Sequence, residues 1–410
     1  MTTTINNEHK KLNFSNEREQ SQACLNSAEH EKNQGQKVLN VPNLRFPEFQ
    51  GEWEVESIKD VADFMGGGTP SSSNESFWQG TIPWVSSSDI VENDIKNISI
   101  SRYITEEAIA HSATKLCPSP SILIVSRVGV GKIALSKKAI CTSQDFCNLI
   151  NIKVDPIFLT YCLSQIMKRK SMEVQGTSIK GITTSEIQKI SINIPSLQEQ
   201  KKIGKILSLL DERIATQNKI IEDLKKLKSA ISESLFHQIK GDVFMLSEVC
   251  EIIKGKQING EFLSEKGKYY VMNGGTEPSG YYSDYNVEAN TISISEGGNS
   301  CGYVQFNTSP FWSGGHCYTI QEIADNVDNL YLYQFLKSKE DAIMKLRIGS
   351  GLPNIQKKDL AMFKIKIPTV EQQKAISTFL SSLERKAEIE ERTQNAMQKE
   401  KLYLLRQMFI

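Results

Sequence analysis

Two glycine-rich stretches of the sequence resemble phosphate-binding loops, and each fails at a position that the chemistry requires. "RVGVGK" ends at Lys132, but the phosphate-loop motif needs Gly at position 126 and Ser or Thr at position 133, where the chain has Ser126 and Ile133. "GGGTPS" begins at Gly66 and places Ser71 where a dinucleotide-binding turn has its third glycine. We therefore interpret both stretches as glycine-rich loops without a nucleotide-binding role.

The serine and histidine residues do not form a catalytic or metal-binding set. "SSSD", from Ser86 to Asp89, lacks a nearby histidine to act as a base, and the whole chain has 5 histidines. His316 stands beside Cys317, but no second pair follows at the spacing of a zinc site. No HExxH motif occurs either, so we expect hydrogen bonding and turn formation rather than catalysis, and no bound metal.

The cysteine pattern and the hydropathy pattern predict a soluble cytoplasmic protein with reduced thiols. No CxxC pair occurs, no apolar signal region follows Met1, and no run of about 18 apolar residues could span a membrane. The cysteines are Cys24, Cys117, Cys141, Cys147, Cys162, Cys250, Cys301 and Cys317.

The charges balance over the whole chain but not along it. Lys plus Arg equals Asp plus Glu at 48 each, so no overall field draws the protein to nucleic acid. Residues 165–240 carry 14 basic against 8 acidic side chains, and residues 337–410 carry 15 against 9. Each segment is therefore basic by six charges, which fits DNA binding, although long solvated helices also carry many lysines.

A repeat organises the chain of 410 residues. "IPSLQEQKKIGKILSLLDERI" from Ile194 returns as "IPTVEQQKAISTFLSSLERKA" from Ile367, an offset of 368 − 195 = 173 between their prolines. The same offset pairs Asp155 with Asp328 and Phe236 with Phe409, so roughly eighty residues align without a gap. A weaker echo links "IKDVADFMGGG" to "LSEVCEIIKGK" at an offset of 188, which indicates a longer middle in the first copy.

Each repeat enters a long helix. Ser196 and Thr369 stand at N-cap positions, with Glu199 and Gln372 three residues later, which is the spacing of a capping box. Apolar residues then recur in steps of three and four, which is typical of a coiled-coil seam, and the weaker second seam favours pairing of the two helices with each other. The predicted seam contains Ile203, Leu207, Leu210, Ile214, Ile221, Leu224, Ile231, Ile376, Leu380, Leu383, Met397 and Leu404.

The remaining segments complete the predicted domain organisation. "SILIV", "TISIS" and "YYVM" are typical of short strands joined by turns, whereas the polar start lacks any apolar periodicity. We expect a disordered extension (1–40), a first variable domain (41–195), a spacer helix (196–240), a second variable domain (241–368) and a second spacer helix (369–410).

The order of several motifs is similar to that of a known family. These motifs are "LRFPEFQGEW", "GGGTPSSSN", "IPWVSSSDI", the "GTSIK" run at 176–180 and the twice-used helix entry after Ile-Pro. Across nearly everything after residue 41, the chain resembles the DNA-specificity subunit of type I restriction-modification systems. It departs from the family in its long polar start and in "GKQING" from Gly255, where the first copy has "GGGTPS".

The resemblance implies a fold and a division of labour. The fold is α+β, with two target-recognition domains of mixed strands and helices, separated by two long helices in an antiparallel coiled coil with pseudo-twofold symmetry. Each domain would read one half of a bipartite site in double-stranded DNA. Two methyltransferase subunits would bring S-adenosylmethionine and two motor-nuclease subunits would bring ATP and Mg²⁺, so this chain would be non-catalytic and hold no cofactor.

Candidate DNA-binding residues carry the donors that phosphates and base edges accept, and those of the first domain lie on Gly- or Ser-rich loops. In the first domain these are Thr69, Ser71, Ser86, Ser87, Arg127, Lys132 and Lys180. In the second they are Lys254, Lys256, Gln257, Asn273, Tyr281, Asn299 and Lys357.

Two other functions stay open from the sequence. A non-DNA-binding coiled-coil adaptor with two protein-binding domains would bind no specific DNA and would show little salt-dependent affinity for duplex. A methyltransferase activity within the chain would require tight binding of S-adenosylmethionine by the isolated protein.

Overall fold

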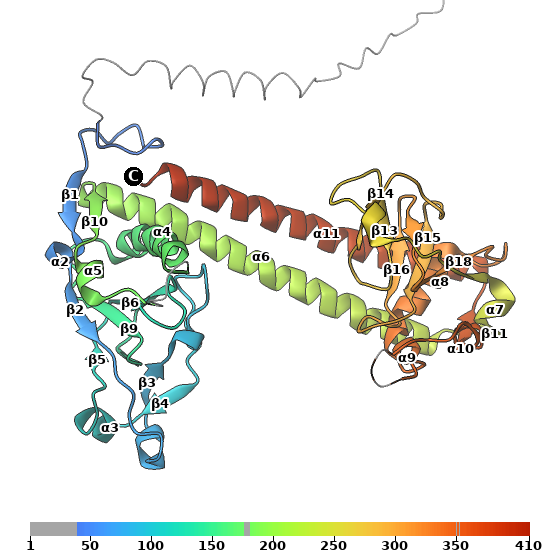
Figure 1. Cartoon of the computed structure of the whole chain (residues 1–410), viewed down its shortest axis with the longest axis horizontal. Coiled ribbons are helices and arrows are strands. Elements are labelled where there is room, and N and C mark those ends of the chain that lie inside the picture. Colours follow the sequence, from blue (N-terminus) through green and yellow to red (C-terminus); the bar gives the residue numbers. More distant parts are fainter. Residues whose placement is uncertain (1–38, 176–180, 350, 352) are drawn as a thin grey trace, which may run out of the picture. The chain divides into compact units, whose positions relative to one another are not determined.

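The computed structural model describes residues 39–175, 181–349, 351 and 353–410 (Figure 1). The predicted disordered extension therefore lies almost entirely outside the described residues, and so does Lys180. The contacts divide the chain into two units. One runs as far as Gly204 and also contains Leu405–Ile410, and the other is Lys205–Leu404.

The first unit contains two four-stranded sheets. One has the order β2-β9-β6-β7, with all neighbours antiparallel, and every residue of "SILIV" in β6 is buried in it. The other has the order β4-β3-β8-β5, with β3 and β8 parallel. The strands are β2 (Asp63–Gly66), β3 (Ile82–Val85), β4 (Arg102–Ile104), β5 (Leu116–Cys117), β6 (Ser121–Val125), β7 (Ile133–Ser136), β8 (Ile140–Thr142) and β9 (Phe146–Ile150).

Short helices and a two-stranded ribbon complete this unit. Helix α4 packs on β6 and β7, and β1 pairs antiparallel with β10. These elements are β1 (Glu54–Ser57), α2 (Ile58–Val61), η1 (Glu75–Trp78), η2 (Ser87–Asp89), α3 (Glu106–Ala110), α4 (Pro156–Gln175), α5 (Thr184–Gln188) and β10 (Ser191–Ile194).

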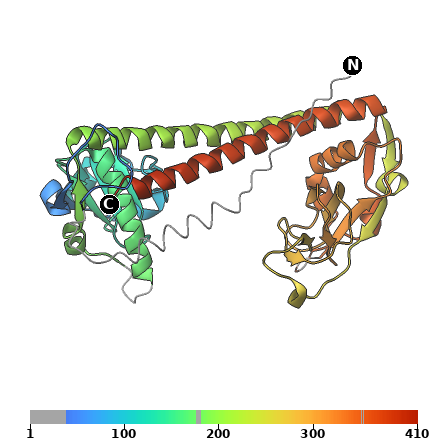
Figure 2. The same cartoon turned by 90° about the horizontal axis from the view of Figure 1, so that it is seen from above.

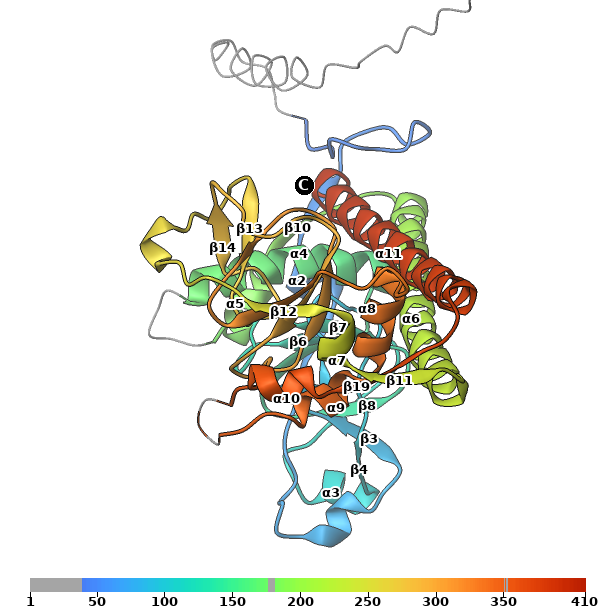
Figure 3. The ribbon, with the colours of Figure 1, turned by 90° about the vertical axis from the view of Figure 1, so that its right-hand side faces the viewer.

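The second unit has a matching architecture. Its sheet β12-β18-β15-β16 corresponds strand by strand to β2-β9-β6-β7, and its parallel pair β13 and β17 corresponds to β3 and β8. The ribbon of β11 and β19 lies beside α7 and α10 (Figure 3). The strands are β11 (Asp242–Met245), β12 (Glu251–Lys254), β13 (Tyr269–Met272), β14 (Gly280–Tyr282), β15 (Thr291–Ser295), β16 (Val304–Asn307), β17 (Trp312–Ser313), β18 (Cys317–Gln321) and β19 (Lys364–Ile367). The short helices are α7 (Leu246–Val249), η3 (Gly260–Phe262), α8 (Asn329–Ser338), α9 (Glu340–Met344) and α10 (Lys357–Ala361).

Two long helices, α6 (Leu197–Gln238) and α11 (Val370–Gln407), follow the ends of β10 and β19 as the repeat predicts (Figures 1 and 2). Within the second unit they pack antiparallel, because Lys401 Nζ lies 2.5 Å from Asp211 Oδ1 while Lys228 pairs with Glu384. All twelve predicted seam residues are buried or half-buried. The predicted α+β fold class with two antiparallel long helices is confirmed.

The helix pair has a twofold axis that the repeat defines. Gln217 Nε2 donates to Glu390 Oε2 at 2.5 Å, and 390 − 217 = 173, so each residue contacts its own counterpart. The same offset relates Lys228 to Lys401 and Asp211 to Glu384, so the ion pairs Lys228–Glu384 and Lys401–Asp211 are counterparts of each other. Such self-complementary contacts are the mark of a twofold interface, here formed within one chain.

The capping box predicted at the start of α6 is only half present. The backbone N–H of Glu199 donates to Ser196 Oγ at 3.4 Å, but the Glu199 carboxylate accepts two hydrogen bonds of 2.8 Å from Arg45. Glu199 is 1% exposed, and a buried carboxylate gains more from a bidentate guanidinium than from a single backbone N–H. The "LRFPEF" segment thus anchors the beginning of the helix.

Aromatic contacts anchor the far ends of both long helices in equivalent ways. Phe409 stacks on Phe158 with ring centroids 5.3 Å apart, and Phe236 contacts Tyr331 edge to face at 5.8 Å. The offset of 173 relates both partners of the two pairs. Over the described residues, none of the helices is long and apolar enough to cross a membrane.

Candidate nucleic-acid interface

Four loops of the first unit meet where strands β2, β3, β6 and β8 end. We call residues 67–69, 86–89, 126–132 and 143–145 loop cluster 1. Backbone hydrogen bonds hold the loops together, from Gly68 N to Thr142 O at 2.8 Å, from Ser143 N to Val85 O at 2.9 Å and from Ser126 N to Asp145 O at 2.8 Å. Short loops fixed to a sheet in this way present side chains with little freedom to move.

Gly67 allows the closest approach in this cluster. A Cβ atom at this position would lie 2.0 Å from the carbonyl oxygen of Ser143. Gly255 occupies the same place after β12, and its Cβ would lie 2.2 Å from the carbonyl oxygen of Gly314. The glycine-rich stretches predicted as loops therefore serve backbone packing at these two positions.

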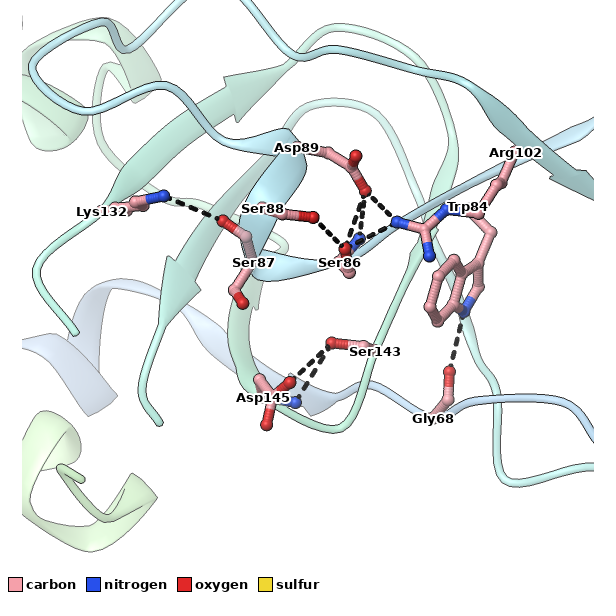
Figure 4. Close-up of polar contacts among 10 residues, drawn as sticks. All are labelled: Gly68, Trp84, Ser86, Ser87, Ser88, Asp89, Arg102, Lys132, Ser143 and Asp145. Carbon is pink, nitrogen blue, oxygen red and sulfur yellow. Dashed lines mark hydrogen bonds and ion pairs between the residues drawn. The ribbon is translucent and has the colours of Figure 1, made fainter. Parts of the chain in front are cut away.

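A polar network of cluster 1 surrounds the end of β3 (Figure 4). Arg102 donates to Ser86 Oγ at 2.6 Å and also pairs with Asp89. Its guanidinium carbon lies 4.5 Å from the ring centroid of Trp84, whose indole N–H donates to Gly68 O at 2.9 Å. Arg102 is thereby held by Ser86, Asp89 and Trp84 in a half-buried position.

The second unit builds an equivalent loop cluster 2 from residues 254–257, 273–274, 296–303 and 314–316. The backbone bonds correspond, from Lys256 N to Ser313 O at 2.8 Å, from Gly314 N to Met272 O at 2.8 Å and from Glu296 N to His316 O at 2.9 Å. The two domains thus place different side chains on one framework.

A tryptophan holds the first loop in both domains, although it comes from a different strand in each. In the first domain Trp84 comes from β3, whereas in the second Trp312 comes from β17, the parallel neighbour of β13. Trp312 Nε1 donates to Lys256 O at 2.9 Å, and Lys256 follows Gly68 by the front offset of 256 − 68 = 188. The same loop carbonyl is therefore held by a tryptophan from either strand.

A family model described as the type I restriction modification DNA specificity domain matches residues 50–226 and 240–399. The chain belongs to this family. It is a DNA specificity subunit of a type I restriction-modification system, which is a non-catalytic role.

Individual relatives agree with the family match. The MjaIX specificity subunit of Methanocaldococcus jannaschii is 31% identical over 219 residues, which is 50% of either chain. The putative MjaX specificity subunit of the same organism is 25% identical over 406 residues, spanning 89% of this chain and 94% of the relative. A crystal structure of the S subunit from M. genitalium has the same fold, with a TM-score of 0.64 at 20% identity over 90% of this chain and 99% of that one.

In the first domain of this specificity subunit, the predicted DNA-binding residues divide into exposed and engaged groups. Thr69, Ser71 and Arg127 are exposed, although Thr69 bonds to Gln144 and Ser71 lies beyond the cluster. Ser86 caps the turn of η2, with its N–H donating to Asp89 Oδ2 at 2.7 Å. The ammonium group of Lys132 donates to Ser87 O at 3.2 Å, and Lys180 is outside the described residues (Figure 4).

In the second domain, Lys256, Gln257 and Asn299 are exposed on cluster 2. Asn273 is engaged, because its Oδ1 accepts the backbone N–H of His316 at 3.1 Å. Lys254 ends β12 and pairs with Glu296 at 2.6 Å.

Two predicted residues lie outside the cluster. Tyr281 belongs to strand β14, where it pairs with Tyr270 of β13. Lys357 is the exposed first residue of α10.

Arg102, beside cluster 1, and Glu296 and His316, within cluster 2, were not predicted as site residues from the sequence. Arg102 stands 16 residues after Ser86, and no local motif links the two. His316 was considered only as half of a zinc site with Cys317, and the structure shows a 63% exposed imidazole beside a buried Cys317. The equivalence of the two domains could have identified His316, since it precedes β18 as Asp145 precedes β9.

Two cysteines of the first domain are buried and unreactive. Burial raises the pKa of Cys117 to about 11 and that of Cys141 to about 12, so both stay as unreactive thiols near neutral pH. Among the residues that the structure describes, no group of three or more His, Cys, Asp or Glu side chains could hold a metal ion.

Proposed function

We propose that this specificity subunit binds double-stranded DNA, with each variable domain reading one half of a bipartite, gapped site. The observation that carries the proposal is the pair of loop clusters, which present different side chains on one framework. Two modules that must dock at once turn two short half-sites into one long one, so the gap between them becomes part of the recognised sequence.

We assign the domains of this function by the boundaries expected from the sequence. Residues 41–195 and 241–368 are the two target-recognition domains, and residues 196–240 and 369–410 are the spacer helices. The DNA contacts come from the exposed members of the two clusters, led by Thr69, Arg127, Lys256, Gln257 and Asn299, with Lys132, Lys180, Lys254 and Lys357 supplying further positive charge.

The spacer helices have a second role as a docking platform. Their twofold contacts support the binding of two copies of one partner in equivalent ways, and we assign these copies as two methyltransferase subunits. Two motor-nuclease subunits complete the complex in the cytoplasm, where the DNA lies. The partners supply S-adenosylmethionine, ATP and Mg²⁺, and the target adenines leave the duplex for methylation.

The test is to co-express the chain with its methyltransferase subunit in a methylation-free host and to map modified adenines by long-read sequencing. A single gapped motif with a methylated adenine in each half is the expected result. A soluble complex with an intact methyltransferase but no methylation would contradict the proposal. Salt-insensitive duplex binding by the same complex would then favour the adaptor function.

A further inference from the structure

A buried carboxylate stands behind loop cluster 2. Glu296 follows the end of β15 and is 7% exposed, which is rare for an ionised side chain without partners. Its Oε1 accepts from Lys254 Nζ at 2.6 Å and from the Tyr318 hydroxyl at 3.0 Å. Burial raises the pKa of Tyr318, so this phenol remains a neutral donor at any working pH.

The second oxygen of this carboxylate is buried and has no hydrogen bond. The imidazole of His316 lies beside this oxygen, with its Nδ1 3.6 Å from Glu296 Oε2. An unpaired buried oxygen is costly, and the imidazole is placed to move toward it. Lys254, Glu296 and His316 therefore form one group, which we call the cluster 2 trio.

The trio distinguishes the second domain from the first. At the equivalent places the first domain has Gly66 at the end of β2, Ser126 after β6 and Asp145 before β9. Because the backbone framework is shared, side chains at these positions can change what the loops recognise without changing the fold.

The outer members of the trio are accessible. The side chain of Lys254 is 52% exposed and that of His316 is 63% exposed, whereas Glu296 lies behind them. Because the carboxylate offsets the ammonium charge, the pair adds little to general attraction for phosphates. It instead holds an N–H donor in a fixed direction, which is what reading a base edge requires.

We infer that Glu296 positions Lys254 and His316 to donate hydrogen bonds to acceptor atoms on a base edge of the second half-site. The acceptors in the major groove are guanine N7 and O6, adenine N7 and thymine O4. Lys254 determines specificity at one position, and Glu296 acts through it as a positioning residue. This inference rests on the proposed function.

The test uses the full chain in complex with its methyltransferase subunit and compares Lys254→Met with Lys364→Gln. Lys364 is an exposed lysine of β19 in the same unit, so its variant matches the loss of charge away from cluster 2. We expect Lys254→Met to relax one position in one half of the methylated motif. We also expect affinity for the cognate duplex to fall by about 5- to 100-fold with an unchanged salt slope. The control variant should keep the motif.

The Glu296→Gln variant distinguishes a positioning role of Glu296 from a purely structural one. It frees the Lys254 charge, so the same position should relax while affinity for unrelated duplex rises and its salt dependence steepens. If the Glu296→Gln variant does not fold, the Lys254→Met variant tests the inference by itself, because Lys254 is exposed.

Two outcomes would overturn the inference. One is an equal loss of affinity for all sequences with a salt slope shallower by about one, which indicates a phosphate contact. The other is an unchanged motif in Lys254→Met. A wild-type complex without any gapped motif would instead contradict the proposed function itself.

Discussion

Gly67 and Gly255 show how single residues fix the loops that we propose carry recognition. A methyl group at either position would collide with a backbone carbonyl, which cannot move without shifting the loop. Gly66, one residue earlier, has no atom within 4 Å of the same hypothetical Cβ. The absence of a side chain is therefore needed for loop packing at Gly67 and not at Gly66.

Gly67→Ala should destabilise the protein by about 1–3 kcal/mol, the usual cost of forcing an extra methyl into a packed site. Gly66→Ala is the matched control and should change the free energy of unfolding by less than about 0.5 kcal/mol. Chemical denaturation of the full chain measures both. Equal stability of the two variants would show that the loop contact at Gly67 is not tight.

Arg127 offers the clearest single contact in the first domain, because its side chain is exposed on cluster 1. Arg127→Ala should relax one base pair of the first half-site, at a cost of about 1–3 kcal/mol, if the guanidinium makes a bidentate contact with guanine. Methylation mapping checks this, with Lys137→Ala in the exposed turn after β7 as the control. Unchanged specificity with a shallower salt slope would assign Arg127 to phosphate.

At this scale the sequence predicted loops better than contacts. Thr69 and Arg127 were predicted on loops and lie on loops. The partners of Lys254 and Asn273, however, are Glu296 and His316, which are 42 and 43 residues away. No local pattern encodes a pairing at that distance, because the sheet topology brings the residues together. Lys132 and Ser87, 45 residues apart, follow the same rule.

At the scale of elements, the long helices are held by a polar layer inside an apolar seam. The Gln217–Glu390 hydrogen bond is flanked by the Lys228–Glu384 and Asp211–Lys401 ion pairs. The side chains of both ion pairs are at least two-thirds buried. Polar groups at such positions fix helix register, because a shift would leave them buried without partners.

A double-mutant cycle on Lys228→Met and Glu384→Gln should give a coupling energy of about 1–3 kcal/mol. The exposed pair of Lys225 and Glu391, at 2.6 Å, is the comparison and should couple by only about 0.2–1 kcal/mol. Denaturant unfolding of the full chain provides all the values. A seam pair that couples no more strongly than the surface pair would refute its role in register.

The helices were the most predictable elements, and their caps were not. Apolar spacing predicted a helix over 196–240 and another over 369–410, and the structure has them at Leu197–Gln238 and Val370–Gln407. The capping box at Glu199 was wrong, because Arg45 lies 154 residues earlier in the chain. The spacing of apolar residues indicates which face of a helix is buried. It cannot indicate that a residue far away in the sequence will bind one of the helix side chains.

At the scale of the whole molecule, we propose that the helix pair acts as a ruler, so that its length sets the gap between the two half-sites. Seven residues inserted after Gln217 and seven after Glu390 would lengthen both helices at their twofold position and keep every flanking pair in register. At about 1.5 Å per residue the insertion adds about 10 Å, so the gap in the methylated motif should grow by about three base pairs. Both half-sites should stay the same, and an unaltered gap would contradict the ruler.

The central claim is that each domain reads its own half-site on an equivalent framework. The most direct measurement replaces Asp242–Ile367 with a second copy of Glu54–Ile194, since the ribbons β11–β19 and β1–β10 pair these end residues with each other. Methylation mapping of this chain with its methyltransferase subunit should give an interrupted palindrome, built from the first half-site and its inverted copy. A folded, active complex that still methylates two different half-sites would contradict the claim.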